Sequence, residues 1–130
     1  MFRLIMATIC GYLIGLERKK HDKSGGSRTM ALMCLSACIV AIISVELSKT
    51  HQLDILRLAQ GTIQGIGFIG AGIIWHYKGE TEGLTTAGIL FTTILIGFLI
   101  GFNFWFYAIL TSIIVYILGE LKYWTNKGDS

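Results

Sequence analysis

Charged and hydroxyl side chains gather at two junctions between long apolar runs, and these junctions hold the best candidates for chemistry. Glu17 ends the first apolar run and Arg28 opens the second, so the two could form an ion pair or bind a polar partner together. Charges at membrane depth are costly unless they are paired. The positions of Glu17 and Arg28 are explained equally well if the two charges only anchor the helix ends at the membrane surface. The candidate cluster consists of Glu17, Arg18, Arg28, Thr29, Glu80, Glu82, Thr85 and Thr86.

Several residues near these junctions also have simpler interpretations. Thr85 and Thr86 could cap a helix that begins beside them, because hydroxyl groups accept hydrogen bonds from the free N–H groups at a helix start. Glu80 and Glu82 lie in a short polar segment, where a solvated turn is the default expectation. His76 stands alone in the sequence, and a lone histidine is more often structural than a ligand.

An enzyme, a metal site and a cofactor all lack support in the sequence. No nucleophile stands beside a base and an orienting group in the patterns that acyl transfer requires. Cys34 and Cys38 share a helical face, but no further ligand lies near them, so we predict packing. Gly65, Gly67 and Gly70 match a nucleotide-binding fingerprint, yet they lie inside an apolar run without the strand and acidic residue of that fold.

A second polar group, the outer polar stripe, follows one face of the third apolar run. It consists of Arg57, Gln60 and Gln64, which are three or four residues apart. An amide group in lipid needs a hydrogen-bond partner. We therefore predict hydrogen bonds between helices here, with a substrate path as the alternative.

The composition places these residues in a membrane protein with the lipid bilayer as its main partner. The chain has 130 residues, of which 53% are hydrophobic and only 15% are charged, whereas soluble domains carry roughly 25% charged residues. The net charge of +3 arises mainly from one short loop, which argues against nucleic-acid binding. Residues 1–130 are expected to form a single all-α membrane domain.

The uncharged runs predict five transmembrane helices. A bilayer core requires about 20 apolar residues per helix. The run between residues 83 and 119 would be ~55 Å long as one helix, nearly twice the thickness of the core, so it must fold back near Asn103. The first helix is the shortest and needs Arg3 to reach the membrane surface. The expected helices cover residues 1–17, 29–46, 58–77, 84–101 and 104–121.

The distribution of basic residues predicts the orientation of the bundle. Five spans place the two termini on opposite sides of the membrane. Eight of the eleven Lys and Arg residues fall on the side that holds the C-terminus. Because cytoplasmic loops are enriched in these residues, we predict an outside N-terminus and a cytoplasmic C-terminus.

Small residues at helical spacing predict close packing between helices, either within one chain or across a homodimer. The third helix holds most of them and is therefore also a candidate for a kink or an unwound turn. The predicted packing residues are Gly11, Gly15, Gly61, Gly65, Gly67, Gly70, Ala71 and Gly72.

Four motifs make the chain similar to the MgtC/SapB family of bacterial membrane proteins. The resemblance extends roughly from residue 11 to residue 101, which is most of the chain. The motifs are Gly15-Leu16-Glu17-Arg18, Ser27-Arg28-Thr29-Met30-Ala31-Leu32, the run from Gln64 to Ile74, and Gly83-Leu84-Thr85-Thr86-Ala87.

The resemblance implies a multi-pass protein of the bacterial inner membrane, linked to magnesium limitation, acid tolerance and virulence. It implies a regulator that contacts another membrane complex, with the proton-translocating ATP synthase as the expected partner. The alternative is a small cation or proton transporter or channel that uses Glu17, Arg28 and the glycine-rich third helix. We expect the short SapB-like form, without the cytoplasmic C-terminal domain of MgtC-type members, because the sequence ends soon after Trp124.

Overall fold

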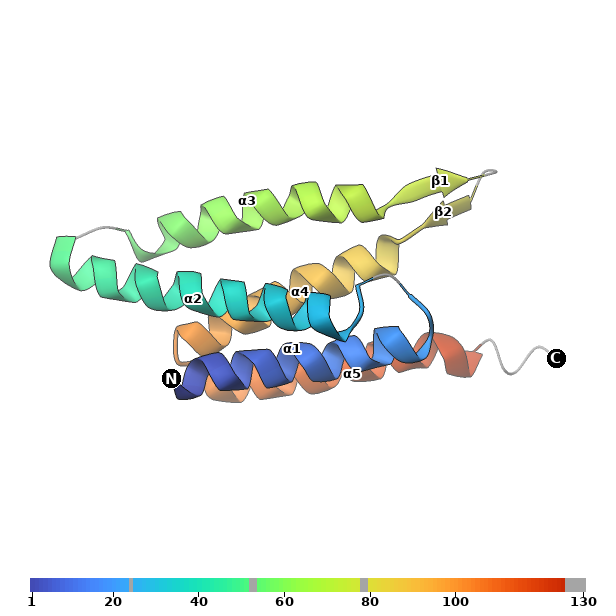
Figure 1. Cartoon of the computed structure of the whole chain (residues 1–130), viewed down its shortest axis with the longest axis horizontal. Helices are drawn as coiled ribbons and strands as arrows, with labels where there is room; N and C mark the ends of the chain where they lie inside the picture. The colour runs from blue at the N-terminus through green and yellow to red at the C-terminus, as the bar shows by residue number, and fades with distance from the viewer. Residues whose placement is uncertain (24, 52–53, 78–79, 126–130) are drawn as a thin grey trace.

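The computed structural model describes residues 1–23, 25–51, 54–77 and 80–125, with the backbone alone at residues 51, 77, 80 and 122–125. Within these ranges the chain forms five helices and one short antiparallel hairpin (Figure 1). The elements are α1 (Phe2–Lys20), α2 (Ser27–His51), α3 (Ile55–Ile73), β1 (Trp75–Tyr77), β2 (Glu80–Glu82), α4 (Leu84–Gly101) and α5 (Trp105–Thr125).

The helices run alternately in opposite directions. Figure 1 shows the connection from α1 to α2, the hairpin and the end of α5 at one end of the bundle, which we call the hairpin end. The N-terminus, the start of α3 and the turn from α4 to α5 lie at the opposite end. Helix α2 contacts α1, α3 and α4, whereas α3 lies at the edge of the bundle against α2 and α4.

Glycines let α1 and α4 approach α2 closely. A Cβ atom on Gly11 would lie 2.6 Å from the backbone oxygen of Met30, and one on Gly15 would collide with Ser27. On the other side of α2, a Cβ on Gly97 would collide with the backbone of Cys34. The predicted packing role of Gly11 and Gly15 therefore agrees with the geometry.

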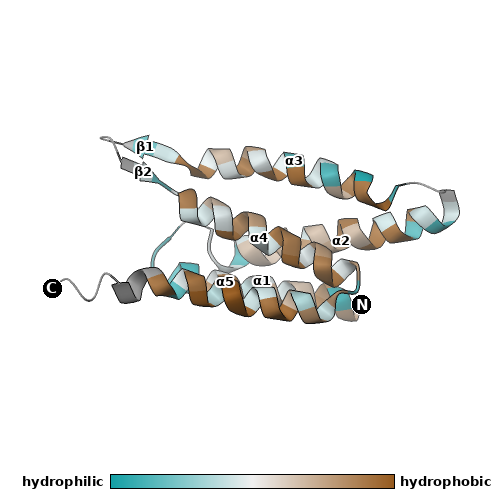
Figure 2. Ribbon diagram, turned by 180° about the vertical axis from the view of Figure 1, so that it is seen from behind, coloured by the Kyte–Doolittle hydropathy of each residue, from teal (hydrophilic) through white to brown (hydrophobic). Residues whose placement is uncertain are grey.

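The outside of the bundle carries many exposed large hydrophobic side chains. Phe2, Ile5 and Ile9 of α1 are exposed, as are Phe106 and Ile117 of α5. Hydrophobic residues dominate the outer faces of several helices in Figure 2. Soluble monomers rarely expose apolar surface on this scale, so these faces indicate contact with lipid.

Two of the described helical segments are long and apolar enough to cross a bilayer, Ser27–Thr50 and Leu84–Gly101. A shorter apolar segment, Trp105–Leu121, lies in α5. Helix α1 has 19 residues, which gives a length of about 28 Å. It is thus longer than the sequence predicted, because the basic residues that were expected to end it form its last turn.

Helices α2 and α3 differ most from the predicted bounds. Helix α2 begins two residues earlier and ends five residues later than predicted, whereas α3 begins three residues and ends four residues earlier. A hairpin that we did not predict follows α3, with Trp75 opposite Glu82. The side chain of Asp54 accepts a hydrogen bond from the backbone N–H of Leu56 and so fixes the helix start. The glycines do not form the unwound turn that was the alternative to packing, because the helix is continuous from Ile55 to Ile73.

Most of the small residues of α3 do not pack within the chain. A Cβ atom on Gly61, Gly65, Gly67 or Gly72 would meet nothing within 4 Å. Ala71 is exposed, and only Gly70 has a neighbour, the Cβ of Ala87 at 3.8 Å. The predicted packing role of these residues is therefore wrong within one chain.

Candidate functional site

A buried ion pair lies near the hairpin end of the bundle. Glu17 and Arg18, on the last turns of α1, are only 2% and 3% exposed. A nitrogen of the Arg18 guanidinium lies 3.6 Å from the Glu17 carboxylate oxygen Oε2. Taking both charges out of water is costly, so such a pair persists only when neighbouring groups also bind it.

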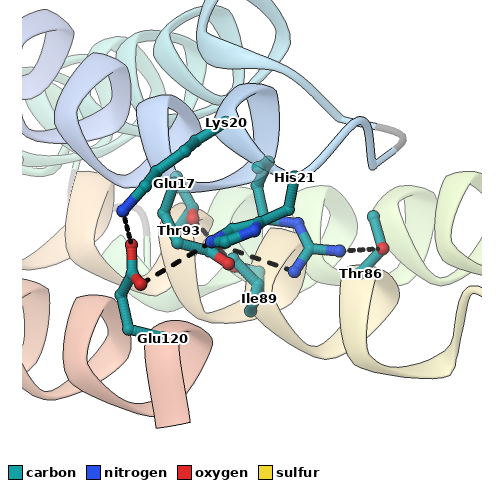
Figure 3. A network of polar contacts seen from close by, with 8 residues as sticks. Glu17, Lys20, His21, Thr86, Ile89, Thr93 and Glu120 are labelled. Atoms are coloured by element: carbon teal, nitrogen blue, oxygen red, sulfur yellow. Dashed lines mark hydrogen bonds and ion pairs between the residues drawn. The ribbon is translucent and has the colours of Figure 1, made fainter. Parts of the chain in front are cut away.

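Arg18 connects α1 to α4. Its Nη2 atom donates a hydrogen bond of 2.5 Å to the hydroxyl oxygen of Thr86. Thr86 is buried in the first turn of α4, and Figure 3 shows its hydroxyl facing the cluster. A hydrogen bond from a charged donor is stronger than one between neutral groups, so this contact fixes the relative position of the two helices.

Glu17 connects α1 to α5 by close contact. A Cβ atom on Gly119 would lie 2.8 Å from both Cδ and Oε2 of Glu17. The carboxylate therefore occupies the space that a Cβ atom at position 119 would fill, so any other residue there would have to displace it. Gly119 allows a charged side chain to approach the backbone of α5 closely.

A second, more exposed group of charges surrounds the pair. Lys20 donates a hydrogen bond of 3.3 Å to Oε1 of Glu120, and Nε2 of His21 lies 3.6 Å from Oε2 of the same carboxylate (Figure 3). Lys20 is 65% exposed, so its ion pair contributes little to stability. These contacts nevertheless bring the end of α5 to the end of α1.

Two atoms of the buried pair form no hydrogen bond with any described residue. They are Oε1 of Glu17 and Nε of Arg18. A buried polar atom without a partner costs about 1–3 kcal/mol. These two atoms are therefore where the cluster could bind a further polar group or ion.

Beside the pair, an open groove of about 280 Å³ lies between α4 and α5. Gly119 and Ile89 line this groove, and Ile89 is also drawn beside Glu17 in Figure 3. The other groove residues include Thr85, Gly88, Thr92, Val115 and Leu118. The groove is thus mostly apolar, with two hydroxyl groups from α4.

The structure corrects two details of the predicted cluster. Glu17 pairs with Arg18 and not with Arg28, because α1 continues to Lys20 and carries Glu17 into the bundle, whereas Arg28 is exposed. The predicted capping role of the threonines is also wrong. The N-cap of α4 is Gly83, with a φ of 85° and no side-chain cap hydrogen bond.

The remaining predicted residues lie at the same end of the bundle but outside the buried pair. Thr29, Glu82 and Thr85 are exposed. The side chain of Glu80 lies outside the described part of the structure. Sequence reasoning missed Gly119 and Glu120, and the only signal for them was their position at the end of the last apolar run.

The outer polar stripe does not form the hydrogen bonds that we predicted. Arg57, Gln60 and Gln64 are all exposed on α3. Their side chains form no hydrogen bond with any residue in the described part of the chain. They face away from α2 and α4, because the residues of α3 that are buried, Ala59 and Ile66, lie on its other side.

Apolar outer faces, long apolar helices and a buried ion pair at one end together indicate a small helical membrane protein. The chain belongs to the MgtC family, whose sequence model matches residues 4–127. The resemblance noted from the four motifs is thereby confirmed.

Several curated proteins are similar to the chain. SapB of Bacillus subtilis is 31% identical to it, over 98% of the chain and 58% of SapB. YhiD of Escherichia coli K12, named as a candidate magnesium transporter, is 35% identical over 93% of the chain and 59% of YhiD. MgtC of Salmonella typhimurium is 33% identical over 88% of the chain and 48% of MgtC.

The chain thus spans 48 to 59% of the length of these relatives. The family match, which begins at residue 4 and ends at residue 127, includes the buried pair and all of the helical bundle except the first two residues of α1. No solved structure matches the chain significantly.

Proposed function

We propose that the chain crosses a bacterial inner membrane five times, with an outside N-terminus and a cytoplasmic C-terminus. The alternating helix directions in Figure 1 support this topology, because α1, α3 and α5 run beside the two long apolar helices. The basic last turn of α1, with Arg18, Lys19 and Lys20, supports a cytoplasmic hairpin end.

Within this topology the chain is a non-enzymatic regulator that acts by contact with another membrane complex. Its function is linked to magnesium limitation and to acid or virulence stress, and the ATP synthase is its proposed partner. The name of YhiD supports the link to magnesium. The cytoplasmic surface around Arg28 and Glu82 would meet the partner.

One observation carries the choice of a regulator over a transporter. Among the described residues, the buried polar side chains that bind other helices lie at the hairpin end, as Glu17, Arg18 and Thr86 do. Deeper in the bundle, the hydroxyls of Ser44 and Thr93 donate to carbonyls of their own helices. An ion path would need polar groups along its whole length.

A growth experiment tests the proposed function. Arg28→Ala should leave the fold intact, because Arg28 is exposed, but should abolish growth on limiting magnesium in a strain that depends on this chain. Lys23→Ala is the matched control, since Lys23 is also an exposed basic residue and lies in the connection just before α2, and it should support normal growth. Equal growth of both variants, at equal protein levels, would contradict a role for Arg28.

A transporter is the second candidate function. The unpaired Oε1 of Glu17 beside the groove between α4 and α5 favours it, as does the name of YhiD.

Flux measurements on the purified protein in liposomes separate the two candidates. The regulator predicts no flux of magnesium, potassium or protons above that of empty liposomes. A flux that Glu17→Gln abolishes would replace the regulator with the transporter.

A further inference from the structure

One face of α3 points away from the rest of the bundle and has the spacing of a helix-pairing seam. We call this face the outward seam; it consists of Arg57, Gly61, Gln64, Phe68 and Ala71. Successive members are four or three residues apart in alternation, which is the heptad spacing of paired helices. All five residues are exposed, and Phe68 is 86% exposed.

Among the described residues, the bundle covers only the opposite face of α3. Ala59 and Ile66 are its buried residues, and α2 and α4 are the helices that it contacts. Gly61 and the adjacent Gly65 have open space where a side chain would be. In Figure 1, α3 is the outermost helix, so a neighbour could reach this face without moving any other element.

Lipid cannot supply a hydrogen bond to the polar side chain at the centre of the outward seam. Gln64 is the tenth of the 19 residues of α3, and the helix runs beside two segments that are long enough to span the bilayer. The amide is therefore placed at the depth of the hydrocarbon core. An amide group without a hydrogen bond in such surroundings costs several kcal/mol. A polar partner at the same depth would remove this cost.

We propose that a second copy of this chain covers the outward seam, with the two α3 helices parallel across a two-fold axis normal to the membrane. The inference rests on the proposed membrane topology. Copies inserted in one orientation place each Gln64 opposite the other at the same depth. An amide both donates and accepts, so the two can pair completely. Gly61, one turn away, lets the two backbones approach closely.

Charges at the start of α3 also complement a second copy. Asp54 and Arg57 are exposed and lie one turn apart, with Asp54 at the N-cap. In a parallel pair, equal residues lie at the same depth, and Asp54 of one copy lies about one turn from Arg57 of the other. Each base can therefore reach the acid of the other copy, which offsets the repulsion between the two Arg57 side chains. A two-fold interface requires this kind of self-complementary surface.

Cysteine cross-linking in native membranes tests the proposed dimer. A disulfide forms only when two Cα atoms come within about 7 Å. Phe68→Cys should therefore give a cross-linked dimer on oxidation with copper phenanthroline. Phe106→Cys, at a 72% exposed position of α5, is the control and should stay monomeric. The unsubstituted chain gives the background from its own cysteines, of which Cys34 and Cys38 are buried.

A second variant separates loss of the dimer from loss of the fold. In Gly61→Leu the new Cβ atom has no described atom of its own chain within 4 Å, but the side chain blocks the approach of another helix, so it should weaken dimer formation by about tenfold. Gly88→Leu, on α4, is equally open within the chain and should leave the dimer unchanged.

Two results would overturn the dimer. One is the absence of a Phe68→Cys cross-link in membranes that contain the inserted protein. The other is a cross-link from Phe68→Cys to a different protein, which would show another occupant of the seam. Either result leaves the growth test of Arg28→Ala unaffected, so the dimer and the proposed function can fail separately.

Discussion

At the scale of single residues, Arg18 has the central position in the structure. It pairs with Glu17 and donates a hydrogen bond to Thr86 while remaining 3% exposed. Removing one partner from a buried charge is more damaging than removing both, because the remaining charge stays without compensation. The hydroxyl group of Thr86 should therefore contribute more to the stability of the fold than its small size suggests.

The two threonines at the start of α4 provide a direct test. Thr86→Val keeps the shape of the side chain but removes the acceptor for Arg18. We expect it to lower the free energy of unfolding by about 1.5–3 kcal/mol, the range for hydrogen bonds to charged groups. Thr85→Val is the matched control, because Thr85 is exposed, and it should have little effect. Thermal unfolding of the protein in detergent, followed by tryptophan fluorescence, measures both.

Equal unfolding temperatures for the two variants would show that the contact between Arg18 and Thr86 does not stabilise the fold. A reduced temperature for Thr85→Val alone would contradict the assignment of Thr86 as the partner of Arg18. The test depends on stability and not on function, so it holds whichever function the chain has.

The sequence indicated which residues meet at the hairpin end but not how they pair. Charges at the ends of apolar runs revealed Glu17, Arg18 and Arg28, because these mark where helices leave the bilayer. The choice between Arg18 and Arg28 depends on where α1 ends, which spacing alone determines poorly. The contact of Glu17 with Gly119 joins segments about a hundred residues apart, and no local pattern encodes it.

At the scale of helices and strands, glycines have two opposite roles in α4. Gly97 lies against the backbone of α2, whereas Gly88 faces open space. Both positions are inside the same helix, so their intrinsic helix propensities are equal. Any difference between substitutions at the two positions must come from packing.

Alanine substitutions measure this difference. Gly97→Ala should destabilise the bundle, because its Cβ collides with the backbone of Cys34, which cannot move as a flexible side chain could. Gly88→Ala should be neutral or stabilise by up to about 1 kcal/mol, because alanine favours the helix. Unfolding temperature and the monodispersity of the purified protein in detergent report the two effects. Similar behaviour of both variants would show that α2 and α4 do not cross at Gly97.

All five predicted helices form, but the charges at the ends of apolar runs located the helix ends poorly for α2 and α3, since α2 continues five residues past Glu46. Residues 84–101 form α4 as predicted, and the chain folds back at Asn103, which has a positive φ of 75°. The hairpin after α3 was missed, because two strands of three residues are too short to show a period of two. The same segment ends α3 early, at Ile73.

At the scale of the whole molecule, the two ends of the bundle differ in their polar contacts. The hairpin end holds the buried pair and the contacts of Glu120 with Lys20 and His21. At the opposite end, Arg3 donates a hydrogen bond of 3.1 Å to the last carbonyl of α4, that of Gly101. A cation at a helix C-terminus is favourable, so this contact holds the start of α1 against the end of α4.

The proposed topology places the two ends of the bundle on opposite sides of the membrane, so it can be tested from outside the cell. Thr81→Cys, exposed in the hairpin, should be protected from a membrane-impermeant maleimide in intact cells and react after the cells are opened. Lys49→Cys, 64% exposed near the end of α2, should react in intact cells. The unsubstituted chain provides the background labelling. The reverse pattern would show that the orientation is inverted. Equal accessibility of both positions would mean that α3 does not cross the membrane. Gln64 would then not lie in the hydrocarbon core, and the reason to propose a dimer through the outward seam would be lost.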